Sequence, residues 1–509
     1  MSLSVIHSGA VLGVRPLAVT VETHLSSGLP SFSIVGLPET AVRESKERVR
    51  SALINSGFNF PMGRITVNLA PADVPKTGGR YDLAIALGIL AASGQLSDRP
   101  VGAFEFYGEL ALSGSLREVP GLLPMALKAP ASMPRCLVVP HAGGQQLGCV
   151  PGLKVRFAES LGEVVAFLKG EGALAEKPNA LEGCEPETHR RHPDFSELRG
   201  QRAARRALEI AASGGHNVLM EGPPGVGKTF MASCLPGIIP ALDDDAALEV
   251  AAIHSLSDRP RGEDDWLIPP LRSPHHSLSV PALLGGTAQL KPGEISLAHR
   301  GILFLDELPE FDRRVLECLR EPLETGQIFL SRAQRKVAYP ARFMLVAAMN
   351  PCPCGYWGQR ISTCRCTPLQ RQRYRNKLSG PLLDRIDLHL VLQPDPPETL
   401  FGTQPLPEAS ETILARVFRA RAKQRTRSGQ LNAELDGGRV EAECDLSPDS
   451  ETILNQAVGK LRLSLRARCR VLRVARTLAD LDDNPSVEAP HVLEALAYRL
   501  PAGHVQGEP

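Results

Sequence analysis

The sequence has almost no net charge, no long hydrophobic run and no export signal at its start. Its 57 Lys and Arg residues balance 56 Asp and Glu residues, so net charge gives no sign of a nucleic-acid or membrane partner and any basic surface must be local. The most apolar stretch, Leu83–Ala92, is too short to span a bilayer, and residues 1–19 lack a basic segment before an apolar core. We therefore expect a cytoplasmic protein with no membrane partner.

The cysteines do not form a pattern typical of a disulfide framework. The chain has 11 of them, an odd number, and without an export signal we interpret them as thiols in a reducing compartment. Four are clustered, as Cys352-Pro-Cys354 and Cys364-Arg-Cys366. Four thiolates at this spacing suit a structural, tetrahedral Zn²⁺ site. Free or redox-active thiols and an iron–sulfur cluster remain as alternatives.

Patterning along the 509 residues predicts a multidomain α/β protein. Ile65–Leu69 alternates like a strand, Tyr81–Ala92 has helical character, and Leu137–Pro140 is a further apolar strand. Segments rich in Gly, Pro and charge mark two linkers, the second with five prolines between 394 and 407. We expect an α+β domain at 1–168, a linker at 169–193, an α/β core at 194–393 with a cysteine knuckle at 352–366, a proline-rich linker at 394–410, and a helical domain at 411–509.

A phosphate-binding loop is the strongest motif in the chain. Residues 222–229 fit the pattern G-x4-G-K-[ST], preceded by an apolar strand and followed by a helical segment. Glycines let backbone N–H groups wrap phosphates, and the helix N-terminus faces the anion. We expect the lysine to reach the β- and γ-phosphates of ATP and the threonine hydroxyl to ligate Mg²⁺. The predicted nucleotide-binding residues are Gly222, Pro223, Pro224, Gly225, Val226, Gly227, Lys228 and Thr229.

Two further apolar strands end in polar residues. Residues 301–307, GILFLDE, predict a buried parallel strand that ends in an acid pair, at the sheet edge where α/β proteins bind ligands. We expect Asp306 to hold Mg²⁺ and Glu307 to polarise the attacking water. Phe343–Met349 predicts another buried strand, followed by Asn350, which can orient that water. The alternative for Asn350 is a turn residue before Pro351.

Together these motifs resemble the AAA+ ATPases. RSPHHS at 272–277, PGEISLAHRGILFLDE at 292–307 and AAMNPCPCG at 347–355 resemble the magnesium-chelatase/MCM branch and, within it, the ComM/YifB magnesium-chelatase-like proteins, over nearly the whole chain. The resemblance implies an AAA+ core with a small helical C-terminal lid. It also implies a hexameric ring with ATP at subunit interfaces. ComM proteins are associated with DNA branch migration during natural transformation.

The resemblance assigns roles to two arginines. Arg385, in LLDRID, is similar to the arginine finger that acts on a neighbouring subunit's γ-phosphate, and Asn350 is similar to sensor 1. Arg466, in Ser464-Leu465-Arg466, is similar to sensor 2. Cations supplied from outside the P-loop suit the charge that spreads over the γ-phosphoryl oxygens. The alternatives are an ion pair of Arg385 with Asp384 or Asp387, and an ordinary basic residue at 466.

Several segments are candidates for DNA contact. Gln327–Tyr339 predicts a hairpin with a basic tip, which can grip phosphates or be a solvated turn. The helix over Ala415–Arg427 carries six cations and no acid, and Leu271–Leu297 is interpreted as an insertion in the helix before the Asp306 strand. Tyr356 and Trp357 of the basic cysteine knuckle are predicted to stack on bases. At the hairpin tip, the predicted DNA contacts are Arg332, Arg335 and Lys336.

The N-terminal region resembles the proteolytic domain of Lon-type proteases, on the residues VNLAPADVPKTGGRYDLAIAL and GELALSGSLREVPGLL. Those enzymes use a Ser–Lys dyad. Aligned with them, the serine position holds Arg80 and the lysine position holds Met125. We therefore predict a Lon-like fold without peptidase activity.

The sequence predicts an ATPase that couples hydrolysis to movement on single-stranded or branched DNA, as a hexameric helicase or branch-migration translocase. Its cofactors are ATP and Mg²⁺, with structural Zn²⁺ in the cysteine cluster. The alternative is a chelatase-type remodeller that acts on a protein partner for metal insertion.

Overall fold

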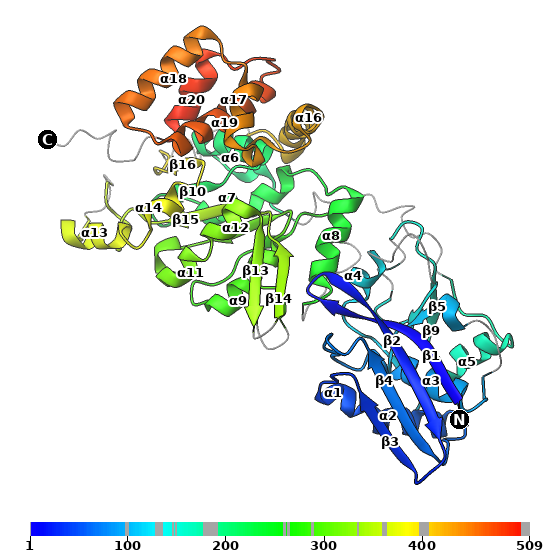
Figure 1. Cartoon of the computed structure of the whole chain (residues 1–509). Coiled ribbons are helices and arrows are strands. Elements are labelled where there is room, and N and C mark those ends of the chain that lie inside the picture. The colour runs from blue at the N-terminus through cyan, green and yellow to red at the C-terminus, as the bar shows by residue number, and fades with distance from the viewer. Residues whose placement is uncertain are drawn as a thin grey trace. The chain divides into compact units, whose positions relative to one another are not determined.

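The structure is a computed structural model. It describes residues 2–96, 101–127, 136–144, 147, 150–176, 192–257, 261, 265–286, 290–332, 335–358, 364–396 and 407–499. The chain divides into two compact units, residues 1–185 with 244–266, and residues 186–243 with 267–509 (Figure 1). The range that the sequence predicts as one α/β core therefore contains a segment that clusters with the N-terminal unit.

The N-terminal unit is built on a mixed seven-stranded sheet in the order β3-β4-β2-β1-β5-β8-β9. β1 and β2 pair antiparallel along their whole length, whereas β5, β8 and β9 run parallel. The predicted strands at 65–69 and 137–140 are confirmed as β4 and β8. The strands are β1 (Ser2–Leu12), β2 (Arg15–Ser26), β3 (Ser31–Val35), β4 (Arg64–Ala70), β5 (Phe104–Phe106), β8 (Cys136–Pro140) and β9 (Val155–Ala158), with the short pair β6 (Glu109–Leu110) and β7 (Leu116–Arg117).

The apolar run near residue 85 is the central core helix of this unit. α3 (Asp82–Ala92) is buried on nearly all sides. A Cβ on its Gly88 would lie 2.4 Å from Oγ1 of Thr23 on β2, so glycine lets the helix approach the sheet closely. The other helices are α1 (Thr40–Arg43), α2 (Ser45–Asn55), α4 (Leu122–Leu127), α5 (Leu161–Lys169) and α8 (Asp244–His254), of which α8 contacts α4.

The second unit contains a five-stranded parallel sheet in the order β11-β12-β15-β10-β16. Its central strands are continuous apolar runs, as expected for a parallel sheet covered on both faces. Because β15 lies between β10 and β12, the ends of the P-loop strand and of the acid-pair strand flank the end of β15. The strands are β10 (Val218–Glu221), β11 (Leu271–Arg272), β12 (Ile302–Leu305), β15 (Met344–Met349) and β16 (Leu388–Val391).

One prediction about this sheet was wrong at its first two residues. Leu271–Leu297 was interpreted as an insertion within a helix, but it begins with β11, whose residues pair with Ile302 and Leu303 of β12. The two residues of β11 are too few for a period to show in the sequence, so their pairing is set by the tertiary structure. The rest of the segment holds the short helices α9 (Val280–Leu284) and α10 (Glu294–Leu297).

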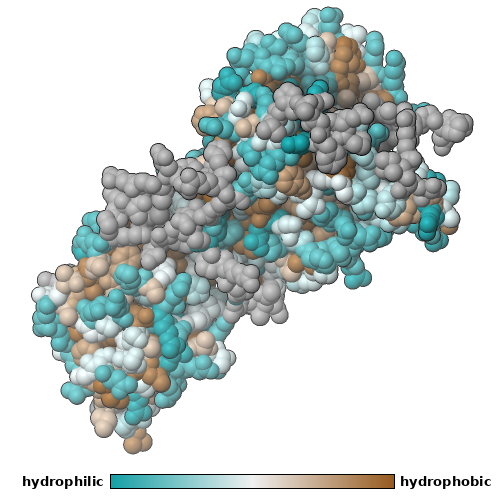
Figure 2. Space-filling view, turned by 180° about the vertical axis from the view of Figure 1, so that it is seen from behind, coloured by the Kyte–Doolittle hydropathy of each residue, from teal (hydrophilic) through white to brown (hydrophobic). Residues whose placement is uncertain are grey.

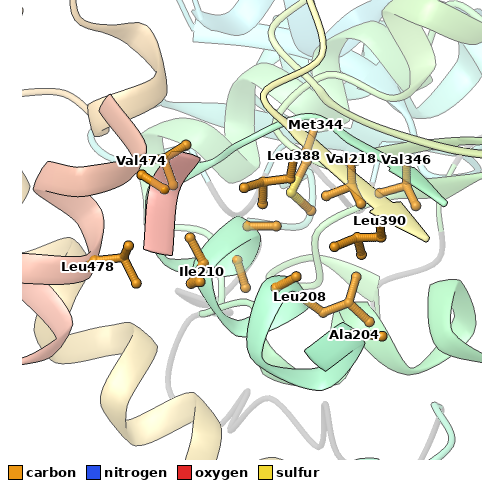
Figure 3. Close-up of a cluster of buried hydrophobic side chains, with 14 of the residues drawn as sticks. Ala204, Leu208, Ile210, Val218, Met344, Val346, Leu388, Leu390, Val474 and Leu478 are labelled. Carbon is orange, nitrogen blue, oxygen red and sulfur yellow. The ribbon is translucent and has the colours of Figure 1, made fainter. Parts of the chain in front are cut away.

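Helices from distant parts of the chain close the core of the second unit. α6 and the C-terminal α19 contact each other and contribute to one hydrophobic cluster with the sheet, as Figure 3 shows for Ile210, Val218, Leu388, Val474 and Leu478. Besides α9 and α10, the α-helices described in this unit are α6 (Arg202–Gly214), α7 (Lys228–Cys234), α11 (Arg313–Glu317), α12 (Arg320–Thr325), α13 (Pro368–Arg375), α14 (Gly380–Leu383), α16 (Ser410–Ser428), α17 (Gly437–Cys444), α18 (Pro448–Leu461), α19 (Leu465–Leu481) and α20 (Ala489–Ala497).

The basic helix α16 uses its cations within the fold. Arg416 bonds Glu209 and Glu408, Lys423 pairs with Asp483, and Arg425 pairs with Asp243. Half-buried Arg421 donates to the carbonyl of Ala212, and Arg427 pairs with Asp480 and Glu443. These partners, distant in sequence, favour a packing role for α16 over a phosphate-tracking surface.

Figure 2 shows hydrophobic residues in patches between hydrophilic residues on the viewed face of both units. None of the helices in the described part of the chain combines the length and the hydropathy that a membrane span requires.

Candidate active site

The P-loop connects β10 to α7 at the carboxyl edge of the parallel sheet. Gly225 and Gly227 have φ angles of +80° and +92°, a backbone region that residues with a Cβ rarely adopt. Lys228 begins α7, so the N-terminus of that helix is part of the loop. The motif therefore has the conformation and the sheet position that phosphate binding requires.

The ammonium of Lys228 is held by oxygens that carry no full charge. Its Nζ donates to the carbonyls of Gly222 at 2.6 Å and Pro223 at 2.8 Å, and to Oδ1 of Asn350 at 3.1 Å. The side chain is buried, and burial lowers the pKa of Lys228 although Asp306 and Glu307 oppose the shift. Within the described part of the chain this buried cation has no bonded carboxylate, which suits an anionic ligand that supplies the opposite charge.

Thr229 and Asp306 come together as the sequence predicts for a magnesium site. Thr229 Oγ1 donates to Oδ2 of Asp306 at 2.7 Å, and the backbone N–H of Glu307 donates to Oδ1. The preceding strand β12 is wholly buried, which fixes the carboxylate at the sheet edge. Hydroxyl and carboxylate oxygens beside a phosphate loop fit the oxygen ligands that Mg²⁺ prefers.

Glu307 has a partner that sequence reasoning missed. Its Oε2 lies 3.4 Å from Nδ1 of His276, and the ring of His276 stacks at 4.0 Å, centroid to centroid, on that of His275. Glu307 itself has φ of +51°, in the left-handed region that costs a non-glycine residue energy. The signal in the sequence was the histidine pair shortly after Arg272, to which no role was given. The structure thus shows that His276 contacts the predicted water-polarising carboxylate.

Arg385, the predicted finger, is buried and ion-paired within its own chain. Its Nη2 lies 2.6 Å from Oε2 of Glu324, and its Nη1 donates to the carbonyl of Pro381. The sequence offered an ion pair with Asp384 or Asp387 as the alternative role of Arg385. Arg385 does form an ion pair, but its partner Glu324 lies about sixty positions earlier, at the end of α12.

Asp387 belongs to a separate buried network. Its Oδ1 lies 2.7 Å from Nη1 of Arg470, and its Oδ2 lies 3.5 Å from Nδ1 of His216. Burial alone would raise the pKa of Asp387, but the nearby His216 ring and the charge of Arg470 outweigh it and hold the pKa well below the usual range. This network fixes the turn that carries Arg385, since the Arg385 carbonyl accepts from Arg470.

Arg466, the predicted sensor 2, shares an acid with Arg385. The Arg466 side chain is 75% exposed, and its Nη2 lies 3.9 Å from Oε1 of Glu324. The bond from Arg385 lowers the pKa of Glu324, and the charge of Arg466 adds to that shift. The structure therefore places both arginines around one carboxylate, and no bond from either to residues 222–229 occurs in the described part of the chain.

The four clustered cysteines have the geometry of a metal site. All four Sγ atoms lie within 4.8 Å of one another. Three of the separations are 3.3, 3.6 and 3.7 Å, and a tetrahedral Zn²⁺ with bonds of ~2.3 Å has sulfur–sulfur edges of about 3.8 Å. The N–H of Tyr356 lowers the pKa of Cys354 to about 6, whereas burial raises the pKa of Cys352 to about 12. The cluster Cys352, Cys354, Cys364 and Cys366 could therefore hold a metal ion.

Trp357 is already used within the protein. Its ring lies 5.1 Å from the guanidinium of Arg371 and 5.0 Å from that of Arg375, both on α13. These contacts stabilise the knuckle against α13. They disfavour the predicted stacking of this ring on a base, whereas Tyr356 is 41% exposed.

The predicted basic hairpin is confirmed as β13 (Gln327–Arg332) paired with β14 (Arg335–Pro340). The side chains of Arg332 and Arg335 lie outside the described residues. Lys336 is exposed opposite Ser331, and Phe329 on the same face is 57% exposed, while Ile328 and Leu330 on the other face are buried. The outer face therefore offers a cation and an aromatic ring.

In the N-terminal unit, the positions aligned with the Lon dyad hold no acid–base pair. Arg80 is buried, donates from Nη2 to the carbonyl of Pro120 at 2.8 Å, and has its pKa lowered by burial. Met125 is buried in α4. A serine and a lysine of this unit, the residue types of the Lon dyad, have other partners. Ser113 hydrogen-bonds Ser115, and Lys76 donates to the carbonyl of Pro71.

The P-loop, the Thr229–Asp306 pair and Asn350 on one parallel sheet define a P-loop nucleotide-binding protein.

Residues 194–400 match the family of magnesium chelatase, subunit ChlI, residues 21–143 match subunit ChlI of Mg-chelatase, and residues 407–499 match the ChlI C-terminal family. The YifB protein of Escherichia coli K12 is 48% identical over 98% of this chain and 97% of its own length. Competence protein ComM of Haemophilus influenzae is 46% identical over 98% of each chain. The chain belongs to this magnesium-chelatase-like AAA+ family, which implies ATP and Mg²⁺ as cofactors.

A partial similarity concerns proteases. Lon protease 2 of Bacillus subtilis is 29% identical over 174 residues, which is 32% of this chain and 31% of that protein. The similarity to a Lon protease therefore covers about a third of each chain.

Two substitutions separate nucleotide binding from turnover. Lys228→Ala removes the buried cation, and loss of a charge-assisted hydrogen bond of ~1.5–3 kcal/mol should weaken ATP binding about 10- to 150-fold. Glu307→Gln keeps the loop and should bind ATP normally while turning it over far more slowly. A fluorescent ATP analogue and a phosphate-release assay measure the two quantities. Loss of ATP binding in Glu307→Gln would instead give Glu307 a structural role.

Proposed function

We propose that this protein hydrolyses ATP at interfaces between subunits of a hexameric ring and uses the energy to move on DNA. The observation that carries the ATP part is the buried Lys228 ammonium, which among the described residues is bonded to neutral oxygens alone and lies beside the Thr229–Asp306 pair. Lys228 would bind the β- and γ-phosphates, and Thr229 and Asp306 would hold Mg²⁺, which neutralises phosphate charge.

In this mechanism Glu307 takes the proton of the attacking water, and Asn350 orients that water from the neighbouring strand. Glu307 is 53% exposed and contacts His276, so its carboxylate can meet a water molecule. Arg385 completes the site from the neighbouring subunit, where a guanidinium stabilises charge on the γ-phosphoryl oxygens. It must first leave Glu324, which Arg466 also contacts. Arg466 would then act from the same side as Arg385.

The DNA part rests on two observations. The full-length relatives include a protein named for competence, and the hairpin β13–β14 presents Lys336 and Phe329 on its outer face. A lysine can neutralise a phosphate, and an aromatic ring can stack on a base of a single strand without reading its sequence. We propose helicase or branch-migration activity in recombination or natural transformation, with this face as a DNA contact.

A chelatase-type remodeller is the second candidate, because the matching families are described as magnesium-chelatase subunits. The full-length identity to ComM favours the DNA motor. We also propose that the cysteine cluster holds structural Zn²⁺, since its sulfur spacing fits a tetrahedral site.

The N-terminal unit is proposed to have the Lon-like fold without peptidase activity. Arg80 stays protonated and Met125 has no proton to transfer, so neither can replace a Ser–Lys dyad. Casein incubated with the protein, ATP and Mg²⁺ should remain intact. Degradation that persists in the purified protein but is absent from Lys228→Ala would contradict this.

The motor proposal predicts that forked or four-way DNA increases the ATP hydrolysis rate and that ATP drives strand displacement. Lys336→Ala should weaken single-stranded DNA binding and lower the slope of log K against log salt by about 1. Phe329→Ala should cost ~1–3 kcal/mol of DNA affinity, or about 5- to 150-fold in Kd.

Matched controls lie elsewhere on the same unit. Phe418→Ala on α16 removes a ring that is 61% exposed, close to the 57% of Phe329, and Lys460→Ala on α18 removes another exposed lysine. Both controls should retain the DNA affinity of the unaltered protein. ATP hydrolysis that no DNA stimulates, with no strand displacement, would overturn the DNA proposal.

A further inference from the structure

The turn of the cysteine cluster rests on the P-loop. Gly355, between the second and third cysteines, has φ of +85°, and a Cβ placed on it would lie 2.7 Å from Cδ of Pro224. A real Cβ does not approach a carbon atom so closely, so the turn and the loop are in contact only because residue 355 is glycine. Any movement of this turn therefore displaces Pro224 or opens a gap beside it.

The cluster is also connected to Asn350. Cys352, whose side chain is fully buried, follows Asn350 by two residues, and Oδ1 of Asn350 accepts from Nζ of Lys228. Burial raises the pKa of Tyr374 on α13 to about 12, and the backbone N–H of Asn350, which acts on the phenol oxygen, opposes that shift. The position of Cys352 thus restricts the residue that contacts the P-loop lysine.

A third connection reaches the strand that carries the P-loop. Trp357 of the knuckle contacts the guanidinium of Arg375, and Nη2 of Arg375 lies 2.7 Å from Oε1 of Glu221, the last residue of β10. Glu221 directly precedes Gly222, whose carbonyl accepts from Lys228. Three connections therefore link the cysteine knuckle to the phosphate-binding loop or to the strand that precedes it.

We propose that the cysteine cluster is a metal site whose occupancy is coupled to nucleotide binding at the P-loop. The inference rests on the proposed function in two respects only: the P-loop binds ATP, and the cluster binds Zn²⁺. The ion fixes four sulfur atoms, and through them the turn that supports Pro224 and the residue that orients Lys228. Because coupling between two sites is reciprocal, bound nucleotide must raise the affinity for metal by the same factor by which metal raises the affinity for nucleotide.

The test compares two equilibrium constants in the full chain without DNA. Elemental analysis first establishes the zinc content, with Cys364→Ser as the variant that should lose it. Competition with a chromogenic chelator then gives the Zn²⁺ affinity with and without saturating non-hydrolysable ATP analogue. Titration of a fluorescent ATP analogue gives nucleotide affinity for zinc-loaded and zinc-stripped protein. We expect a common factor of at least about 5 in both comparisons, within the usual range of coupling between sites.

Two glycines of the knuckle provide a matched pair of variants that retain every cysteine. Gly355 and Gly358 have φ of +85° and +80°, so alanine strains the backbone at either position, but a Cβ at Gly358 would meet no atom within 4 Å. Gly355→Ala should bind Zn²⁺ yet lose nucleotide affinity and most of the coupling factor. Gly358→Ala should bind Zn²⁺ and keep both.

Equal nucleotide affinities for loaded and stripped protein would overturn the proposal, as would equal effects of Gly355→Ala and Gly358→Ala. A purified protein that holds no metal would overturn it together with the zinc assignment. Failure of the DNA proposal leaves these measurements unaffected, since none of them involves DNA. If stripping unfolds the chain, the comparison of the two glycine variants in zinc-loaded protein still decides the outcome.

Discussion

The buried ammonium of Lys228 is the interaction on which the site depends. Among the residues that the structure describes, its three hydrogen-bond acceptors are two backbone carbonyls and one amide oxygen, so dipoles solvate the charge and none of these residues balances it with a bonded carboxylate. Burial of such a charge is costly unless a partner of opposite sign is supplied. The nearby acids do not fill this role, since Asp306 is bonded to Thr229 and Glu307 contacts His276. The arrangement is therefore incomplete until a phosphate binds.

The fold builds this phosphate site by placing the carboxyl ends of three parallel strands side by side. β15 lies between the P-loop strand and the acid-pair strand, so Asn350 can bond Lys228 while Asp306 faces Thr229. The same edge carries the cysteine knuckle, which contacts Pro224 and, through Trp357 and Arg375, Glu221. In the described part of the chain, the two arginines proposed to stabilise charge on the γ-phosphate form no bond with this edge. Arg385 and Arg466 surround Glu324 instead, as expected if they serve a different copy of the chain.

The features that the sequence predicted well are those encoded locally. The P-loop, the buried strand before Asp306 and the hairpin at 327–340 each depend on neighbouring residues, and a contiguous pattern identifies them. Contacts between distant segments had no such signal. The pairing of Glu307 with His276 requires β11 beside β12, and Glu324 meets Arg385 only through the tertiary fold. The cations of α16 looked like a phosphate-binding surface because their acidic partners come from other helices. The hydropathy pattern likewise did not predict that α8 packs against α4 in the N-terminal unit.

The central claim is that a guanidinium from one subunit completes the phosphate site of the next, and mixing two inactive variants tests it most directly. Lys228→Ala removes the P-loop ammonium that would bind the phosphates, and Arg385→Ala removes the guanidinium that would come from the neighbouring subunit. In a ring with head-to-tail interfaces, random mixing in equal amounts restores about one quarter of the sites, each with Lys228 from one variant and Arg385 from the other. We predict ATP turnover in the mixture well above that of either variant alone. A mixture that is no more active than its components, or a monomer that hydrolyses ATP at the full rate, would contradict the account.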